Sequence, residues 1–166
     1  MTAAETPPRR SVVAQRGAAA AGKSPWAGLP AGALVVVDTA PLIYLLEDHP
    51  QFLPGFIGLF EAEAAGALQI AVSTITVAEV LTGPMHTGQD ALASRYEVAL
   101  SSFTVVPVDL GVAVLAARLR ARYGLKLPDA IQLATALSLG AAALVTHDRD
   151  FARVHGLAIL RGEFGA

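Results

Sequence analysis

The sequence of 166 residues contains no cysteine. This absence excludes disulfides, thiolate metal sites and cysteine nucleophiles, and it fits a reducing cytoplasm, where we expect the protein to reside. The chain also lacks long apolar runs, because Gly, Pro, Asp or Glu interrupts each of them, although 54% of its residues are hydrophobic. A membrane-spanning helix needs about 18 or more apolar residues in succession, so the sequence predicts no membrane span.

Charge is scarce and unevenly distributed, with a net charge of -2. Residues 1–31 hold four basic residues and one acidic residue, whereas the rest of the chain holds eight basic and thirteen acidic residues. A mildly acidic domain is not a general binder of nucleic acid. Any contact with a polyanion would need a local group of Arg and Lys, or metal ions that neutralise carboxylates.

The first 31 residues are rich in Ala, Gly, Pro, Ser and Arg and show no sustained hydrophobic periodicity. This composition is typical of a flexible tail. A targeting peptide is an alternative interpretation of an Arg-rich, acid-poor start. We therefore expect a flexible N-terminal tail over residues 1–31 and one domain over residues 32–166.

From residue 33 the pattern alternates between strand and helix. Strands are expected at 34–37, 69–72, 104–108, 142–146 and 157–160. Helices are expected at 41–47, 54–65, 89–101 and 110–123. A further helix begins after a cap at Ser73 or Thr74, another begins at Pro128, and a helical turn is expected at 150–154. The Gly83-Pro84 pair is expected in a loop, and Asp109 is expected to cap its helix. Short strands separated by helices indicate a mostly parallel sheet of four to five strands, covered on both faces.

Acidic residues lie at the edges of these apolar segments, and each of them has an ordinary structural explanation. Asp38 follows the first strand and could cap the next helix, while Glu79 could lie on a solvated helix face. Asp129 lies in a first helical turn, where an acid suits the helix dipole. Asp148 and Asp150 follow a strand and could serve in a turn.

As a group these acids favour a shared site, because acids follow two of the strands and two more acids lie on helices that would flank those strands. Carboxylates that share a cleft repel one another and raise each other's pKa. A hard divalent cation such as Mg²⁺ or Mn²⁺ relieves this repulsion through oxygen ligands. Such a site can activate water and offset charge on a phosphodiester.

Four pieces of the sequence resemble the PIN-domain ribonucleases, most closely the VapC-like toxins of bacterial toxin–antitoxin pairs. The pieces are VDTAPLI at 37–43, STITVAE at 73–79, LPDAIQLATA at 127–136 and LVTHDRDF at 144–151, in the order and spacing of the family. The resemblance covers residues 33 to about 161. It implies a three-layer α/β/α sandwich and a ribonuclease that depends on Mg²⁺ or Mn²⁺.

The resemblance also implies roles for single residues. Asp38, Glu79 and Asp129 match the first three catalytic and metal-binding acids. The fourth is open between Asp148, which we favour because it is nearer the strand end, and Asp150, which we expect to cap the helical turn. Thr146 matches a hydroxyl residue that could hold a metal-bound water.

The partners that the resemblance implies are an RNA substrate, a small cognate antitoxin and a second copy of the chain. A homodimer could use the apolar run of Phe52, Phe56, Ile57, Leu59 and Phe60, which suits a protein core equally well. Which RNA is cut, and where, stays open. A PIN fold without catalysis, serving as an RNA- or protein-binding module, is the alternative function.

Basic and aromatic residues give weaker signals. Arg118 and Arg122, near Arg120, fit a solvated helix face, or together with Lys126 a phosphate-contacting edge. Arg149 could contact phosphate or pair with a carboxylate. His147 is interpreted as a strand-end residue rather than a zinc ligand, and Trp26 and Tyr44 do not form an aromatic row for base stacking.

Two other enzyme and signalling classes place an Asp after the first strand, and both lack a required part. A phosphatase of the haloacid-dehalogenase type needs a second Asp two residues later, but position 40 is Ala. A phosphoacceptor receiver domain needs a Lys after a late strand. The chain has only Lys23 and Lys126, and neither follows such a strand.

Overall fold

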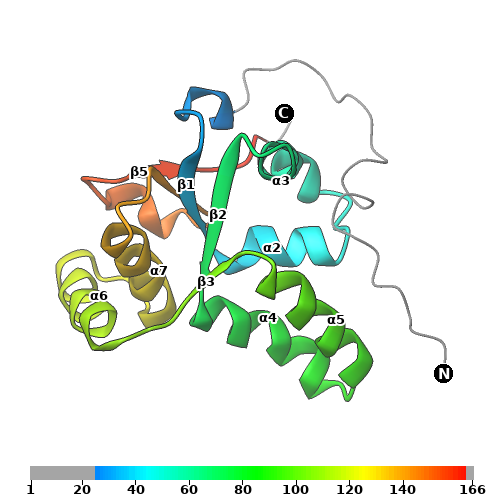
Figure 1. The fold of residues 1–166 in the computed structure, drawn as a ribbon. Helices are drawn as coiled ribbons and strands as arrows, with labels where there is room; N and C mark the ends of the chain where they lie inside the picture. The colour runs from blue at the N-terminus through cyan, green and yellow to red at the C-terminus, as the bar shows by residue number, and fades with distance from the viewer. Residues whose placement is uncertain (1–24, 164–166) are drawn as a thin grey trace.

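Five strands form one parallel sheet in the order β3-β2-β1-β4-β5 in the computed structural model, which describes residues 25–163 (Figure 1). The strands are β1 (Ala33–Val37), β2 (Leu68–Ser73), β3 (Thr104–Val106), β4 (Ala143–Val145) and β5 (Ala158–Leu160). The predicted α/β class, with a parallel sheet of four to five strands, is confirmed.

The valines of β1 show why this strand lies at the centre. Val35, Val36 and Val37 are completely buried. Val36 packs in one core cluster, and Val35 and Val37 pack in another, because successive side chains of a strand point to opposite faces. An uninterrupted apolar run is therefore what a strand covered on both faces requires.

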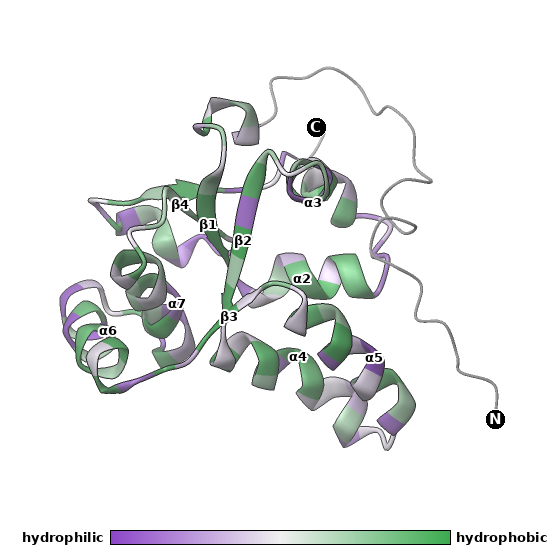
Figure 2. Ribbon diagram, viewed as in Figure 1, coloured by the Kyte–Doolittle hydropathy of each residue, from purple (hydrophilic) through white to green (hydrophobic). Residues whose placement is uncertain are grey.

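Helices cover the two faces of the sheet and complete the predicted α/β/α sandwich. The helical segments are η1 (Pro25–Gly28), α2 (Thr39–Leu46), η2 (Leu53–Gly55), α3 (Ile57–Ala64), α4 (Thr74–His86), α5 (Asp90–Ser101), α6 (Leu110–Tyr123), α7 (Leu127–Ser138) and η3 (Asp150–Arg153). Helices α6 and α7 lie on one side, and α2 and α3 on the other (Figure 1). The apolar strands run between them in the hydropathy view (Figure 2).

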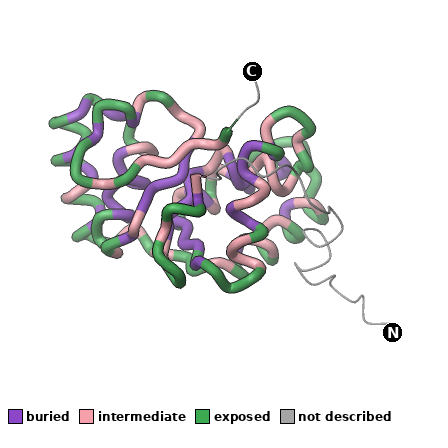
Figure 3. The backbone as a smooth tube through the Cα atoms, turned by 90° about the horizontal axis from the view of Figure 1, so that it is seen from above, coloured by how far each residue is buried: buried purple, intermediate pink, exposed green. Residues whose placement is uncertain are grey.

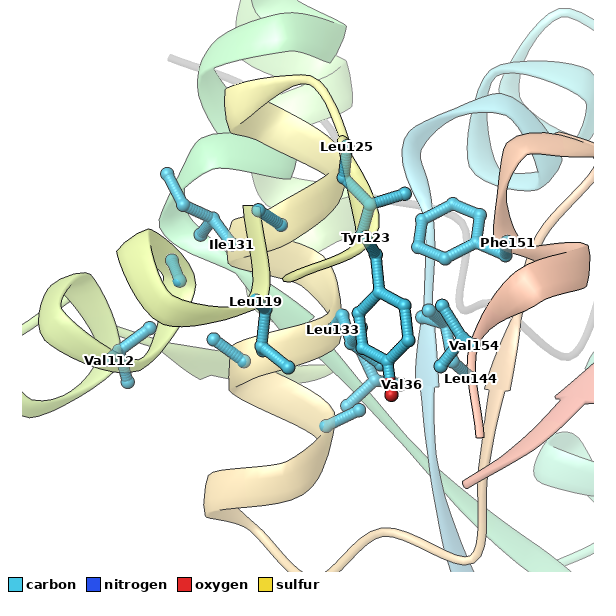
Figure 4. Packing of buried hydrophobic residues seen from close by; sticks show 14 of the residues in the cluster. Val36, Val112, Leu119, Tyr123, Leu125, Ile131, Leu133, Leu144, Phe151 and Val154 are labelled. Carbon is cyan, nitrogen blue, oxygen red and sulfur yellow. The ribbon is translucent and has the colours of Figure 1, made fainter. Parts of the chain in front are cut away.

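The two core clusters follow this layering. Leu119 and Tyr123 of α6 and Leu133 of α7 pack on Val36 and Leu144 of the sheet (Figure 4). The opposite cluster joins residues of α2 to α5, including Leu42, Phe56, Leu59, Phe60, Val80 and Leu100. Buried residues alternate with exposed ones along most elements, as expected for helices and strands that pack on a core with one face (Figure 3). Of the two interpretations of the apolar run at 52–60, the structure confirms core packing for Phe56, Leu59 and Phe60.

Residues at the ends of α4 and α6 cap these helices as predicted. Ser73 caps α4 by accepting from Thr76 N at 3.1 Å, and Asp109 caps α6 by accepting from Val112 N at 2.8 Å. Gly124 ends α6 in the left-handed conformation, with φ of 67°. Among residues 25–163, no helix combines the length and the apolar character that crossing a membrane would demand.

Two predicted helix boundaries are wrong. Gly83 and Pro84 lie inside α4 rather than in a loop, and Pro84 is buried. Proline removes only one helical hydrogen bond this close to the end of a helix, and its burial offsets that loss. The single helix expected at 54–65 is divided into η2 and α3, because Phe56 has a non-helical φ of -120°.

The folded part of the chain begins earlier than residue 32. Trp26 in η1 is only 6% exposed and stacks on Phe56, with the ring centroids 6.2 Å apart. Gly32 N then donates to Ala67 O at 2.8 Å and leads the chain into β1. Residues 25–31 therefore belong to the domain, whereas residues 1–24 of the expected tail lie outside the described residues.

Trp26→Ala should destabilise the protein by about 3 kcal/mol, because truncating a buried aromatic ring leaves a cavity against Phe56. Deleting residues 1–30 should cost at least as much, whereas deleting residues 1–24 keeps Trp26 and serves as the control. Urea denaturation of the three variants measures these differences. Equal stability of both deletion variants would show that Trp26 does not belong to the core.

Candidate active site

The register of the two central strands brings Asp38 next to Thr146. Val37 of β1 pairs with Val145 of β4, so the residues that follow them leave the sheet side by side. Asp38 N donates to Val145 O at 2.9 Å, and Thr146 Oγ1 donates to Asp38 Oδ2 at 2.7 Å. The carboxyl ends of parallel strands are where α/β sheets bind ligands.

Asp38 is both a helix cap and a buried acid. Its Oδ1 accepts from Thr39 N at 2.7 Å, which confirms the predicted capping of α2. The side chain is only 7% exposed. Burial raises the pKa of Asp38 above its ordinary value, the hydrogen bonds from Thr146 and Thr39 lower it, and the charges of Glu79 and Asp148 raise it again.

Glu79 approaches the same place from α4. Its Oε2 accepts a hydrogen bond from the Thr39 hydroxyl, so the first turn of α2 joins Glu79 to Asp38. Glu79 is half-buried rather than fully solvated. The solvated-face interpretation of Glu79 is therefore wrong, because the side chain points toward the start of α2.

Asp129, Asp148 and Asp150 form a close group, and the charges of Asp129 and Asp148 interact with that of Asp38. A carboxylate oxygen from each of Asp129, Asp148 and Asp150 lies within 4.8 Å of those from the other two. Asp129 comes from the first turn of α7, and the other two come from the segment between β4 and η3. Three of the acids that the sequence analysis groups together therefore lie close in space, and their roles stay a prediction.

Asp129 has the least satisfied charge of the group. Its Oδ2 is buried and has no hydrogen-bond partner among the described residues. The pKa of Asp129 is raised from 3.8 to about 6, first by burial and then by the charges of Asp38, Asp148 and Asp150, while the charge of Lys126 lowers it. A buried oxygen that lacks a donor, among like charges, is what a bound cation would satisfy.

The expected capping role of Asp150 is wrong, whereas Asp148 lies in the acidic group as expected. Asp148 Oδ1 accepts from Asp150 N at 2.8 Å, so Asp148 forms the turn before η3. Asp150 does not cap this helical turn, which is preceded by Arg149 without a side-chain cap. Asp150 instead joins the acidic group together with Asp148.

Thr146 links two of the acids. Its hydroxyl donates to Asp38 Oδ2 and accepts from Asp148 N at 2.9 Å. Thr146 therefore orients Asp38 and Asp148. Its hydroxyl has a second acceptor lone pair, so its expected role of holding a metal-bound water stays a prediction.

An aromatic cluster, missed in the sequence, supports the segment that carries Asp148. Tyr44 Oη lies 2.7 Å from His147 Nδ1, and the His147 ring packs edge-on against Tyr44, Phe52 and Phe56. The spacing of Tyr44, His49, Phe52 and Phe56 at intervals of three to five residues is the signal that could have revealed this cluster. His147 therefore packs in the protein, as expected for a strand-end residue.

The basic residues divide into two groups. Arg118, Arg120 and Arg122 are exposed on α6, and the Arg122 guanidinium lies 5.2 Å from the centre of the Tyr123 ring. Lys126 is also exposed, but its charge acts on Asp129. Arg149 is exposed between Asp148 and Asp150. Lys126 therefore acts on the acidic group, and Arg149 is adjacent to two of its members in the sequence.

Residues 35–157 match the family model of the PIN domain. The chain therefore belongs to the PIN-domain family, and its predicted resemblance to VapC-like toxins is confirmed. One similar structure is a chain of a toxin–antitoxin complex from Klebsiella pneumoniae, with 34% identity over 75% of this chain and 95% of that chain and a TM-score of 0.60. No curated protein sequence matches the chain.

Two more distant structures share the fold. VapBC2 from Rickettsia felis, bound to a DNA fragment from its promoter, has 20% identity over 78% of this chain and 99% of that chain, with a TM-score of 0.65. VapC20 from Mycobacterium tuberculosis, described as a toxin that cleaves the sarcin–ricin loop, has 19% identity over 71% of this chain and 92% of that chain, with a TM-score of 0.55.

Asp129→Asn should raise the Tm of the metal-free protein at pH 8, because it removes an unpaired buried charge. The pKa of Asp129 is raised from 3.8 to about 6, so its ionisation costs stability in the folded state. This cost grows as the pH rises from about 4 to about 6 and is complete above that range. The increase in Tm over the wild type, measured in EDTA, should therefore shrink as the pH falls from 6 toward 4.

The exposed Glu97 on α5 offers a control, because Glu97→Gln also removes one negative charge but lies outside the acidic group. Its Tm should follow that of the wild type across this pH range. A Tm for Asp129→Asn below that of the wild type at pH 8 would show that the charge of Asp129 does not destabilise the folded protein.

Proposed function

We propose that this PIN-domain protein is a divalent-metal-dependent endoribonuclease and the toxin of a toxin–antitoxin pair. One observation carries the enzymatic part of the proposal: the three clustered carboxylates of Asp129, Asp148 and Asp150 include a buried oxygen without a donor. Asp38 and Glu79 border the same edge of the sheet. A site of this composition is suited to phosphodiester chemistry rather than to nucleophilic catalysis by a side chain.

The donor set fits Mg²⁺ or Mn²⁺. All five groups offer carboxylate oxygens, which hard cations prefer, and the chain has no cysteine to favour a softer metal. Asp129, Asp148 and Asp150 would hold the ion, with Asp38 and Glu79 completing the acidic set. When bound, the ion would supply an activated water and offset the charge that develops on the scissile phosphate.

The residues of the chain contribute orientation and charge. Thr146 fixes the Asp38 carboxylate, and Thr39 fixes both Asp38 and Glu79, so these acids cannot rotate freely. Lys126 and Arg149 offer positive charge beside the carboxylates, where an RNA phosphate would otherwise be repelled. Arg118 and Arg122 would extend this attraction along α6 and add affinity without sequence specificity.

The proposed biological partners rest on the structural relatives. The relative from Klebsiella pneumoniae is described as a toxin–antitoxin complex, and the one from Rickettsia felis as a VapBC pair. We propose that this chain likewise binds a small cognate antitoxin, forms a homodimer and acts on RNA in the cytoplasm. The complete set of acids favours a catalyst over a PIN fold that only binds RNA or protein.

The purified protein should cleave RNA when Mg²⁺ or Mn²⁺ is added and should stop when EDTA is added. Asp150→Ala should lower the cleavage rate by at least about 100-fold, since even outer-shell changes at metal sites cost 10- to 100-fold. Glu97→Gln serves as the matched loss of an acid elsewhere and should keep full activity. Gel analysis of a labelled structured RNA measures both.

Undiminished cleavage in EDTA would contradict the metal-dependent mechanism. RNA binding without cleavage under any metal would instead support the non-catalytic alternative.

A further inference from the structure

Three polar side chains are completely buried between α4 and α7. Ser73 ends β2 and caps α4, Thr76 lies in the first turn of α4, and Gln132 lies in α7. Burying a polar group is unfavourable unless it is hydrogen-bonded. Burying one amide and two hydroxyls would therefore cost stability unless these groups form hydrogen bonds with one another.

The three side chains satisfy one another. Gln132 Nε2 donates to Thr76 Oγ1 at 2.6 Å, and Ser73 Oγ donates to Gln132 Oε1 at 3.0 Å. The hydroxyl proton of Ser73 is used in this bond. In the 3.3 Å contact between the two hydroxyls, Thr76 Oγ1 is therefore the donor and Ser73 Oγ the acceptor. The result is a closed ring of three hydrogen bonds, in which each member polarises the next.

This ring lies one helical turn from two of the acids. Gln132 is three residues after Asp129 in α7, and Thr76 is three residues before Glu79 in α4. Residues three apart on a helix are neighbours on the same face. The hydrogen bond from Gln132 to Thr76 therefore joins the two helices close to the place where each presents its carboxylate.

The two helices belong to different layers. The neighbours of Gln132, Ile131 and Leu133, pack in the core cluster on the side of α6 and α7. Val80 of α4 packs in the cluster on the opposite face. Ile75 in the first turn of α4 reaches the first cluster, and the amide of Gln132 adds a polar contact to this junction between the two helices.

We propose that Gln132, Thr76 and Ser73 form a positioning clamp that sets Asp129 of α7 relative to Glu79 of α4. The proposal rests on the metal-dependent function above, because it concerns the geometry of the same acids. None of the three clamp residues touches the reacting atoms. A displacement of about 1 Å from the productive geometry can reduce a rate by about 100-fold, so loosening the clamp should weaken catalysis and metal binding together.

A matched pair of substitutions separates positioning from general stability. Thr76→Val removes the hydroxyl from the clamp while keeping the shape of the side chain. Thr135→Val removes another completely buried hydroxyl, but one whose hydrogen bond among residues 25–163 is donated to Ile131 O at 2.8 Å, within α7. Thr76→Val removes two hydrogen bonds of the ring, one of which joins the two helices, whereas Thr135→Val removes one hydrogen bond within α7.

The clamp predicts that Thr76→Val raises the Kd for Mn²⁺, measured by electron paramagnetic resonance, by about tenfold and lowers kcat by about 10- to 100-fold. Thr135→Val should leave both values within about twofold of the wild type. Thr76→Ser keeps the hydroxyl and should restore them. Gln132→Met, which leaves Ser73 and Thr76 paired with each other, should repeat the losses of Thr76→Val even if the latter folds poorly.

Equal Mn²⁺ affinity and kcat in Thr76→Val, Gln132→Met and Thr135→Val would overturn the clamp while leaving the proposed function intact. A wild-type protein that neither binds Mn²⁺ nor cleaves RNA would overturn the proposed function, and the positioning role with it.

Discussion

Repulsion among carboxylates at the carboxyl ends of β1 and β4 is the constraint on which the rest of this structure depends. Asp38 tolerates burial there because Thr146 and Thr39 donate to both of its oxygens. Glu79 is held by the Thr39 hydroxyl, and Asp148 by the backbone of Asp150. Asp129 alone keeps a buried oxygen without a donor among the described residues, and its pKa is raised accordingly. The unbalanced charge is thus concentrated at one place, where a cation would stabilise it.

The sheet and the helices each position some of these acids, and together they bring the negative charge to one place. The valines of β1 bury both faces of the central strand, so the sheet gives Asp38 and Thr146 fixed positions. The α7 helix, packed on one face, brings Asp129, and α4, which contributes to the opposite core, brings Glu79. The buried ring of Ser73, Thr76 and Gln132 ties these two layers together next to the acids. Precision in the site therefore depends on contacts that are remote in sequence.

Much of the fold could be predicted because its causes are local. The apolar run before Asp38, the caps at Ser73 and Asp109 and the stop at Gly124 each act within a few residues. The acids could be grouped by motif, but their individual roles could not. Whether Asp148 or Asp150 forms the turn depends on the exact path of the chain after β4. The positions of Trp26, Pro84 and Gln132 cannot be predicted from the local sequence, because they depend on partners that are distant along the chain.

The most direct test of this account is the location of a metal ion. Crystals grown with Mn²⁺ and measured near the manganese absorption edge should show an anomalous peak in contact with carboxylate oxygens of Asp129, Asp148 and Asp150. Such a peak would explain the unpaired oxygen of Asp129 and the convergence of three acids. Ordered carboxylates with no anomalous peak between them, at Mn²⁺ concentrations that support cleavage of RNA, would contradict the central claim.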